Sequence, residues 1–489
     1  MTASIPGPVP TESGETSLPP EFYRLAVVLL TGVLAVVFDT TIVSVAVRAL
    51  AGDLHTTVAT IQWVTTGYLL ALGVAVPLSG WLVDRLGGKR VWVLSLSIFL
   101  IGSLASSLAQ NAPMLISSRL VQGIGGGLML PVMQTLLVRA AGGRSLGKAT
   151  SLIALPAMLG PILGPVIGGL IVENWSWRWV FWVNIPFCLA GLLLAWRLMP
   201  TETGNRTQRL DLIGLALLSP AIVALLYGLS QIGAVGGFGD GSVVVPLVIG
   251  IALLTSFVSY ALRATAPLVD LRLFTVSSFA SSTVLMFLSG FVLYGALLVM
   301  PLYFQDIRGQ SPLHTGLLLA PQGIGILASR GLAGSLTDRI GSRWVVFVGL
   351  LLAAAGTVPF AHADTGTGTN QWLVMAALVV RGFGLGGVTL PLFATAYLGL
   401  DRTQIADASI ITRAAQQIGG SFGSAVLVLV LANQLTHHPA DHINAYQTTF
   451  WFTIAFTLAA ILLALRLPTR TPAKATRLPA AKAAGASTR

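Results

Sequence analysis

The stretch GWLVDRLGGKR (residues 80–90) returns in altered form as GSLTDRIGSR (residues 334–343), about 254 residues later. Both copies fit the pattern G-x-L-x-D-R-x-G. A second repeated pair follows farther along each copy, with RLVQGIGGG starting at Arg119 and RGFGLGG starting at Arg381, about 262 residues apart. Because the two offsets nearly agree, the sequence predicts two halves that share one architecture.

Composition indicates that both halves lie in a membrane. Of the 489 residues, 54% are hydrophobic and 9% are charged, which is typical of a polytopic membrane protein. Since about 20 apolar residues cross a bilayer, we expect about fourteen spans. They are predicted at residues 25–47, 60–83, 91–110, 113–138, 148–172, 179–199, 210–231, 244–264, 277–304, 313–337, 344–362, 371–396, 405–433 and 448–467.

The repeat and the spans together predict an all-α polytopic membrane protein. Spans 1 to 6 correspond to spans 9 to 14. We therefore expect two six-helix halves, at residues 25–199 and 277–467, separated by a linker (200–276) that carries two extra transmembrane helices. Residues 1–24 and a basic tail at residues 468–489 flank the helices.

The distribution of charge predicts the topology. The net charge is +11, and the basic residues lie between spans. With the N-terminus inside, only Arg48, Arg178 and Arg308 fall in outer segments, so we expect both termini to be cytoplasmic in a multi-pass protein of the cell membrane. A nucleic-acid partner is not expected, because it would need a basic face on a soluble domain. The lone Cys188 excludes an intrachain disulfide.

These motifs, in this order, resemble the fourteen-span drug:proton antiporter branch of the major facilitator superfamily. Further segments typical of that branch are QWVTTGYLL from Gln62, WRWVFWVNIP from Trp177 and LYFQDIRGQSP from Leu302. The chain departs from the pattern where Gly88 replaces a basic residue and where Ser44 and Arg48 replace Asn and Pro. The resemblance implies a major facilitator fold, function as a monomer, no enzymatic activity and no cofactor.

Two sets of residues are candidates for a conformational switch. In GPILGPVIGG (160–169), three glycines recur every four residues and share one helix face, which suits either tight packing or a moving seal. The Asp-Arg loops suit either ordinary cytoplasmic turns or, as the resemblance implies, a latch that stabilises the outward-facing state. The candidates are Gly160, Gly164, Pro165, Gly168 and Gly169, and in the loops Gly80, Asp84, Arg85, Gly87, Lys89, Asp338 and Arg339.

Asp39 is the only acidic residue that falls deep inside a predicted span. An intramembrane carboxylate is costly enough that a functional role is the default hypothesis, and Arg119 lies at a similar depth in the fourth span. We therefore expect Asp39 and Arg119 to couple transport to protons. The alternative for Arg119 is structural hydrogen bonding between helices.

Other polar and aromatic residues suit a substrate cavity or plain helix packing. The candidates are Gln62, Trp63, Tyr68, Met129, Gln134, Tyr294 and Tyr303. We expect Arg330, Arg381 and Arg413 to snorkel or to bind backbone carbonyls, and the tryptophans at 175, 177, 179 and 182 to form an interfacial belt. No metal site is expected, since His437, His438 and His442 fall on a predicted outer loop. The glycine runs lie inside apolar helices, which disfavours nucleotide binding.

The expected function is export of a small lipophilic drug or antibiotic across the cytoplasmic membrane in exchange for protons, by alternating access. Two alternatives stay open. The same cycle would export an endogenous metabolite, or the chain would be a membrane sensor or scaffold that keeps a transporter fold without turnover.

Overall fold

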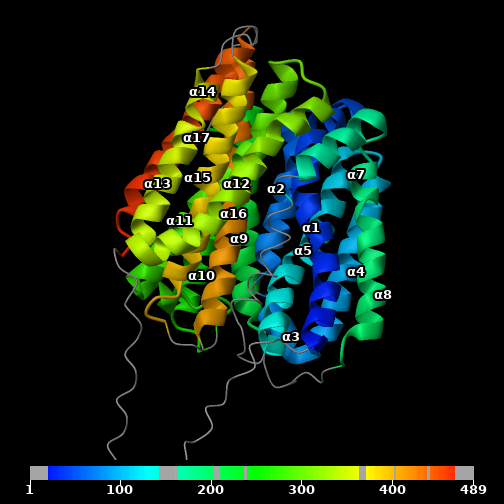
Figure 1. Cartoon of the computed structure of the whole chain (residues 1–489), viewed down its shortest axis with the longest axis vertical. Helices are drawn as coiled ribbons and strands as arrows, with labels where there is room; N and C mark the ends of the chain where they lie inside the picture. The colour runs from blue at the N-terminus through cyan, green and yellow to red at the C-terminus, as the bar shows by residue number, and fades with distance from the viewer. Residues whose placement is uncertain are drawn as a thin grey trace, which may run out of the picture.

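The chain folds into a bundle of long helices (Figure 1). The structure, a computed structural model, describes residues 20–468 except 77, 142–159, 161–162, 202–209, 236–238, 266, 363–369, 401–403 and 438–440. Within these residues there is no β-strand, and 12 helices are long and apolar enough to cross a membrane. The all-α membrane architecture expected from composition is therefore confirmed.

The helices divide into two halves and a central pair. The N-terminal half contains α1 (Pro20–Asp53), α2 (Val58–Ala75), α3 (Leu78–Leu86), α4 (Gly88–Ser107), α5 (Ala112–Ala141), the helix Leu163–Asn174, α7 (Trp179–Trp182) and α8 (Asn184–Leu198). The central pair is α9 (Leu212–Val235) and α10 (Gly241–Ala261). The C-terminal half contains η1 (Leu271–Thr275), α11 (Ser277–Asp306), α12 (Pro312–Ile340), α13 (Ser342–Ala355), α14 (Val358–Ala361), α15 (Gln371–Ala396), α16 (Gln404–His437) and α17 (His442–Ala464).

Within the described residues, three of the spans predicted from hydropathy are each divided into two helices. The second span is divided into α2 and α3 between Ala75 and Leu78, the sixth into α7 and α8, and the eleventh into α13 and α14. The first part of the predicted fifth span lies outside the described residues. Its remainder is the helix Leu163–Asn174. That helix and the 29-residue α12 supplement the 12 apolar spans, so the organisation into about fourteen spans holds.

The duplicated motif has the same backbone conformation in both halves. Gly87 separates α3 from α4 with φ 86° and ψ 150°, and Gly341 separates α12 from α13 with φ 86° and ψ 156°. Residues other than glycine rarely adopt a positive φ of this kind. The last glycine of the motif is therefore needed for the turn between two helices.

The basic residues just after these turns hold equivalent helix ends. The ammonium group of Lys89 donates to the carbonyl of Met199 at 2.7 Å, at the end of α8. Nε of Arg343 donates to the carbonyl of Leu467 at 2.5 Å, just past α17. A cation at a helix C-terminus satisfies free carbonyls and complements the helix dipole. Lys89 therefore joins α4 to the end of α8, and Arg343 joins α13 to the end of α17. These are the third and sixth spans of their respective halves.

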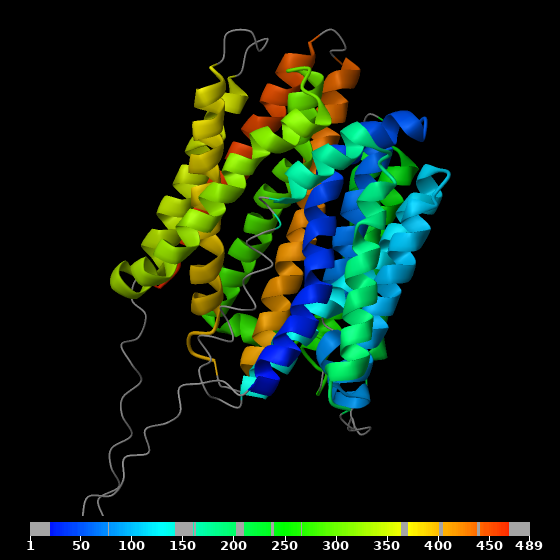
Figure 2. The same ribbon diagram turned by 45° about the vertical axis from the view of Figure 1, so that its right-hand side comes forward.

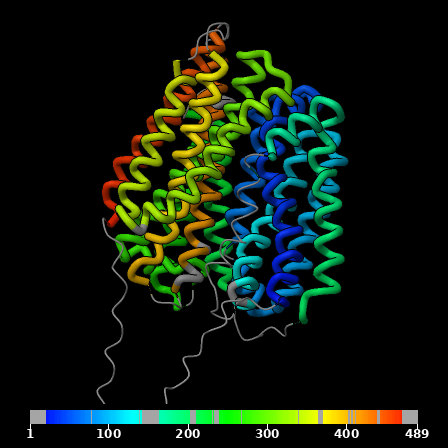
Figure 3. The backbone as a smooth tube through the Cα atoms, in the orientation of Figure 1, coloured from blue at the N-terminus to red at the C-terminus, as the bar shows by residue number. Residues whose placement is uncertain are grey.

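The two halves lie side by side (Figures 1 and 3). Contacts between them join α2 to α16 and α1 to α11. The central pair α9 and α10 pack on each other, and α9 also contacts α16 and α2 (Figure 2). Leu226 of α9 is buried there with Leu70 of α2 and Ala425 of α16. Only 17% of the α10 span is buried, so most of this helix faces the lipid.

Polar contacts join the halves at the end of the bundle where α1 finishes. Arg48 donates from Nη1 to the carbonyl of Gln305 at 2.7 Å and lies 3.2 Å from Oδ1 of Asp306. Nε2 of Gln305 donates in return to the carbonyl of Val45 at 3.0 Å. The outer ends of α1 and α11, as the topology predicts them, are thus fastened together.

Two single-cysteine variants test the topology. Ser242 lies at the start of the 21-residue α10 and Arg263 lies two residues past its end, and both are exposed. In a Cys188→Ala background we expect Ser242→Cys to react with an impermeant thiol reagent in intact cells, and Arg263→Cys to react only after the cells are opened. The reverse pattern would invert the predicted orientation.

Candidate functional site

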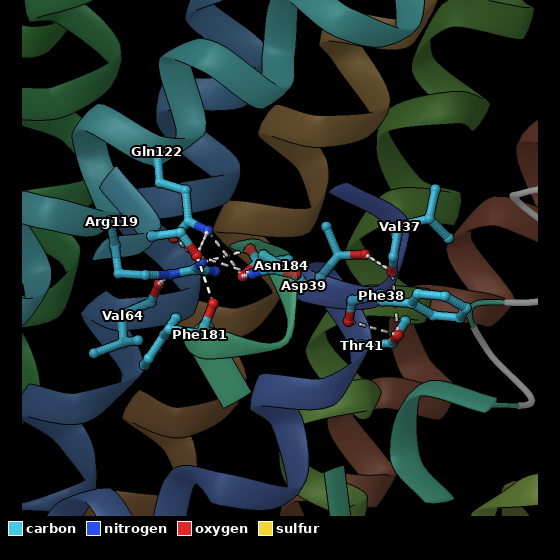
Figure 4. A network of polar contacts seen from close by, with 11 residues as sticks. Val37, Phe38, Asp39, Thr41, Val64, Arg119, Gln122, Phe181 and Asn184 are labelled. Carbon is cyan, nitrogen blue, oxygen red and sulfur yellow. Dashed lines mark hydrogen bonds and ion pairs between the residues drawn. The ribbon is translucent and has the colours of Figure 1, made fainter. Parts of the chain in front are cut away.

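The candidate site is built around Asp39, whose side chain is completely buried within the N-terminal half (Figure 4). Asp39 lies near the middle of the 34-residue α1, far from either end of the helix. A charge in such a position is tolerated only when other groups neutralise it and satisfy its hydrogen bonds.

Arg119 of α5 provides the neutralising charge. Its Nη1 lies 2.5 Å from Oδ2 of Asp39, and its own side chain is 1% exposed. Nε of Arg119 donates to the carbonyl of Val64 on α2 at 3.1 Å. The similar depths estimated from the sequence thus correspond to a direct ion pair, which joins α1, α2 and α5.

Three further polar side chains complete the network around the carboxylate. Oδ1 of Asp39 accepts from Nε2 of Gln122 at 3.0 Å and from Nδ2 of Asn184 at 2.9 Å. The same Asn184 nitrogen lies 3.2 Å from Oγ of Ser103, whose hydroxyl donates to the carbonyl of Phe181 at 2.9 Å. Sequence reasoning assigned no role to Asn184 or Ser103. The signal available in the sequence was a polar residue inside a predicted apolar span.

The aromatic ring of Tyr68 covers the other side of the Arg119 guanidinium. Its centroid lies 3.9 Å from Cζ of Arg119, a close cation–π contact. Among the described residues, the Tyr68 hydroxyl and Oδ1 of Asn184 are buried without a hydrogen-bond partner. The network is therefore closed to solvent in this conformation and still contains polar atoms that are free to bond.

The glycine face of residues 160–168 packs directly on α1 around Asp39. A Cβ atom built on Gly160 would overlap the side chain of Val37, and one on Gly164 would overlap Thr41. One on Gly168 would lie 2.6 Å from the carbonyl of Ile42. At Gly168 the backbone of α1 leaves no room for a side chain, and at Gly160 and Gly164 the side chains of Val37 and Thr41 occupy the space.

Other glycines in this region contact the opposite half. A Cβ atom on Gly169 would overlap the carbonyl of Pro312 at the start of α12, and one on Gly316 of α12 would overlap the carbonyl of Pro165. The carboxylate of Glu173 also accepts from the backbone N–H of Leu313 at 2.9 Å. The same helix therefore contacts the carboxylate-bearing part of α1 on one face and the C-terminal half on another.

The first Asp-Arg loop is held within its own half. Asp84 accepts from Arg139 of α5 at 2.8 Å, with both side chains substantially exposed. Cζ of Arg85 lies 5.3 Å from the ring of Trp81. In the second loop Arg339 is exposed, and the Asp338 side chain lies outside the described part. A latch function for these loops stays a prediction.

The residues predicted to line a cavity lie in different environments. Gln62, Met129 and Tyr303 are buried, and Tyr303 packs among aromatic rings of the C-terminal half. Trp63, Gln134 and Tyr294 are partly exposed. The other four candidates, Gln62, Tyr68, Met129 and Tyr303, are buried in this conformation.

The four tryptophans that were predicted to form an interfacial belt differ in their exposure. Trp175, Trp179 and Trp182 are exposed, as an interfacial belt requires, whereas Trp177 is 4% exposed and donates to Asp53 at 2.7 Å. Within the described residues no three metal-binding side chains gather. His438 lies outside those residues.

Arg381 occupies the place in the C-terminal half that the repeat assigns to Arg119. It is fully buried, and its partners are neutral: Oε1 of Gln322 at 2.7 Å and the carbonyl of Val292 on α11 at 3.2 Å. Arg381 thus binds a backbone carbonyl, one of the two roles considered for it. Among the side chains that the structure describes, Arg119 has a carboxylate partner and Arg381 has none, so the duplicated fold carries an asymmetric charge arrangement there.

Comparison with known proteins agrees with this architecture. Residues 29–424 and 283–489 match the model of the Major Facilitator Superfamily. The chain is 37% identical over 400 residues to a multidrug resistance protein B homolog of Mycobacterium tuberculosis, covering 82% of this chain and 74% of that protein. It is 28% identical over 396 residues to the lincomycin resistance protein LmrB of Bacillus subtilis, covering 81% and 82%.

A solved structure shares the fold at low sequence identity. The crystal structure of a D-xylose-proton symporter superposes with a TM-score of 0.68 at 17% identity, covering 92% of this chain and 98% of the symporter.

Proposed function

This chain belongs to the Major Facilitator Superfamily, and on that basis we propose that it exports small lipophilic compounds, including drugs or antibiotics, from the cell in exchange for protons. The names of the relatives support the drug substrates. The observation that supports proton coupling is the Asp39–Arg119 ion pair. Its carboxylate is completely buried and lies near the middle of the membrane-spanning helix α1.

Proton coupling follows from the two states of the Asp39 carboxyl. As a carboxylate it binds Arg119, Gln122 and Asn184. When it gains a proton, the ion pair is lost and Arg119 keeps only its neutral partners, so the balance of packing in the N-terminal half changes. In this proposal the amide of Asn184, whose Oδ1 has no donor among the described residues, reorients to accept a hydrogen bond from the protonated carboxyl.

The glycine face links that change to alternating access. Gly160, Gly164 and Gly168 lie against residues 37–42 of α1, which flank the carboxylate. A small displacement of α1 therefore acts on the helix Leu163–Asn174, whose other face contacts α12. In this proposal the contacts of Gly169 and Glu173 with α12 close the outer side while the cytoplasmic side is accessible, and both termini are cytoplasmic.

Transport by the purified protein in liposomes tests the proposal. With an imposed pH gradient we expect accumulation of lipophilic drugs against their concentration gradient, abolished by a protonophore. Accumulation of endogenous metabolites but no drugs would favour the metabolite exporter. Absence of any gradient-driven movement, with the protein folded and oriented, would favour the sensor or scaffold.

A further inference from the structure

An apolar groove runs along the surface of the C-terminal half, at the end of the bundle that carries the second Asp-Arg loop. Its walls are α12 and α13, which are joined at Gly341, and its floor is α15. The space measures about 450 Å³ with its open side included, which is enough for a hydrocarbon chain or a small apolar molecule. The lining includes Leu332, Leu336 and Ile340 of α12, Trp344 and Val348 of α13 and Gly387 of α15.

The floor of the groove contains a glycine that faces open space. A Cβ atom built on Gly387 would meet nothing within 4 Å, although the residue is buried. Its neighbours on α15 differ, since a Cβ atom on Gly384 would overlap the carbonyl of Gly349 and one on Gly386 would overlap the side chain of Ser329. A hydrocarbon group can therefore lie above Gly387 without displacing a side chain.

The groove is closed toward the interior of the bundle and open toward the lipid. α12 and α15 pack backbone to backbone, because a Cβ atom on Gly325 would overlap the carbonyl of Val379 and one on Gly382 would overlap the carbonyl of Gln322. The residues on the open side are large, apolar and exposed, so in a membrane they face acyl chains. The groove is therefore filled from the bilayer.

The corresponding positions of the N-terminal half are packed. The repeat of the Asp-Arg motif aligns Leu82 with Leu336 and Leu86 with Ile340. Leu82 and Leu86 pack against the core of their half, whereas Leu336 and Ile340 are 40% and 47% exposed. The opening therefore belongs to the C-terminal copy and is not a consequence of the shared fold.

A cation lies at the predicted cytoplasmic end of the groove. Arg339 directly precedes Ile340 and is exposed. Among the side chains that the structure describes, no acidic group pairs with it. Its counterpart Arg85 lies 5.3 Å from the ring of Trp81, and Ser335 stands in place of that tryptophan here. The guanidinium of Arg339 is therefore available to a negative group at the membrane surface.

The length of the groove matches one leaflet of a bilayer. From Ile340 to Ser329 it extends roughly 16 Å along α12, at about 1.5 Å per residue, and half of the hydrocarbon core is about 15 Å thick. Trp344 is exposed at the cytoplasmic end of the groove, where tryptophan favours the level of the head groups. Ser329 and the hollow above Gly387 lie at the deep end, where an acyl chain would finish.

We propose that this groove holds one acyl chain of an anionic phospholipid of the inner leaflet, with the head group at Arg339 and the chain extending past Leu336 toward Gly387. Such a lipid combines a hydrocarbon chain of leaflet length with a negative charge at the surface. Basic pockets between transmembrane helices on the cytoplasmic side bind head groups of this kind. The proposal does not depend on the proposed export function.

Photocrosslinking from the lipid tests the occupant. Phosphatidylglycerol or phosphatidylcholine with a diazirine near the end of one acyl chain is added at a low fraction to phosphatidylcholine nanodiscs that hold the full-length protein, and labelled residues are identified by mass spectrometry. We expect about fivefold more label at residues 383–387 with the phosphatidylglycerol probe. Val248 and Ile251 of α10, which are exposed, should be labelled equally by both probes. Equal labelling of residues 383–387 by the two probes, or none, would overturn the proposal.

Variants of Arg339 test the role of its charge. Arg339→Gln should remove the preference for phosphatidylglycerol at residues 383–387, and Arg339→Lys should keep most of it because the charge remains. The matched control is Arg263→Gln, the same change at another exposed arginine, which should label like the wild type. A preference that survives Arg339→Gln refutes the assignment of the head group to this cation.

A variant of Gly387 tests the path of the chain. Gly387→Leu places a side chain in the hollow, so the ratio of phosphatidylglycerol to phosphatidylcholine label at Leu336 and Val348 should fall to the ratio on α10. Gly52→Leu, at an exposed glycine where a Cβ atom also meets nothing within 4 Å, should leave the ratio unchanged. An unchanged ratio in Gly387→Leu would refute this path. If that variant does not fold, Gly387→Ala should lower the ratio in part.

A lipophilic solute is the alternative occupant of the groove. Pyrene, which is apolar and uncharged, is added in excess during crosslinking. If the lipid occupies the groove, we expect pyrene to change the labelling of residues 383–387 and of α10 to the same extent. Selective loss of label at residues 383–387 would assign the groove to a solute and would contradict the lipid proposal.

Discussion

Asp39→Asn is expected to abolish accumulation driven by a pH gradient, since the amide cannot exchange a proton in the range where a carboxyl does. Accumulation ratios in liposomes should fall to the equilibrium value, while movement of substrate down its own gradient continues. Transport with and without an imposed gradient, measured on the same preparation, separates these two activities.

The same substitution also disturbs a buried ion pair, so stability needs its own measurement. Removing one partner of such a pair typically costs about 3 to 5 kcal/mol, because the remaining charge is left uncompensated. Asp39→Asn combined with Arg119→Gln removes both charges and should recover much of the thermal stability. It should still show no gradient-driven accumulation.

Asp53→Asn is the matched control for Asp39. It makes the identical change on the same helix, at an end where the carboxylate is 52% exposed and pairs with Arg178. Exposed pairs contribute about 0 to 1 kcal/mol, so near-normal accumulation is expected. If Asp39→Asn accumulated substrate as well as Asp53→Asn does, the carboxyl of Asp39 would have no part in coupling.

Gly164→Leu is expected to reduce transport at least tenfold while the protein still inserts in the membrane. Even a methyl group at this position would overlap Thr41, two residues from Asp39. Overpacking typically costs about 1 to 3 kcal/mol, which shifts an equilibrium between two conformations by roughly tenfold to a hundredfold. Transport rates and the accessibility of a reporter cysteine on each side would measure both effects.

The control for this substitution is Gly52→Leu, near the end of α1. Gly52 is exposed, and a Cβ atom there would meet nothing within 4 Å. Its transport should stay close to that of the wild type. Normal transport by Gly164→Leu would mean that the close contact between α1 and the helix Leu163–Asn174 is not part of the cycle.

Position along a helix was predictable from the sequence because the rise per residue is constant. That regularity placed Asp39 and Arg119 at similar depths, and the structure joins them at 2.5 Å. The spacing of the repeated motifs predicted the duplication. In the structure, Gly87 and Gly341 of the two copies share one unusual backbone conformation. The breaks within three of the spans were missed because a hydropathy window of about 20 residues averages over an interruption of one or two residues.

Which helix faces which was not predictable in the same way. The sequence showed that Gly160, Gly164 and Gly168 share a face, and only the structure shows that this face lies on α1 beside Asp39. Asn184 and Ser103 join the carboxylate from two other helices. Their rotation about the helix axis is set by the packing of several helices at once, and no local pattern encodes it.

The sequence by itself therefore determined the membrane class, the two related halves, the family resemblance and the central acidic residue, because each depends on composition, spacing or depth. The tertiary structure alone decided the contacts: the ion pair of Asp39 with Arg119 and the hydrogen bonds that Gln122 and Asn184 donate to the same carboxylate. Residues far apart in the chain become neighbours only when whole helices pack. The chemistry of a buried charge depends on those neighbours more than on the residue itself.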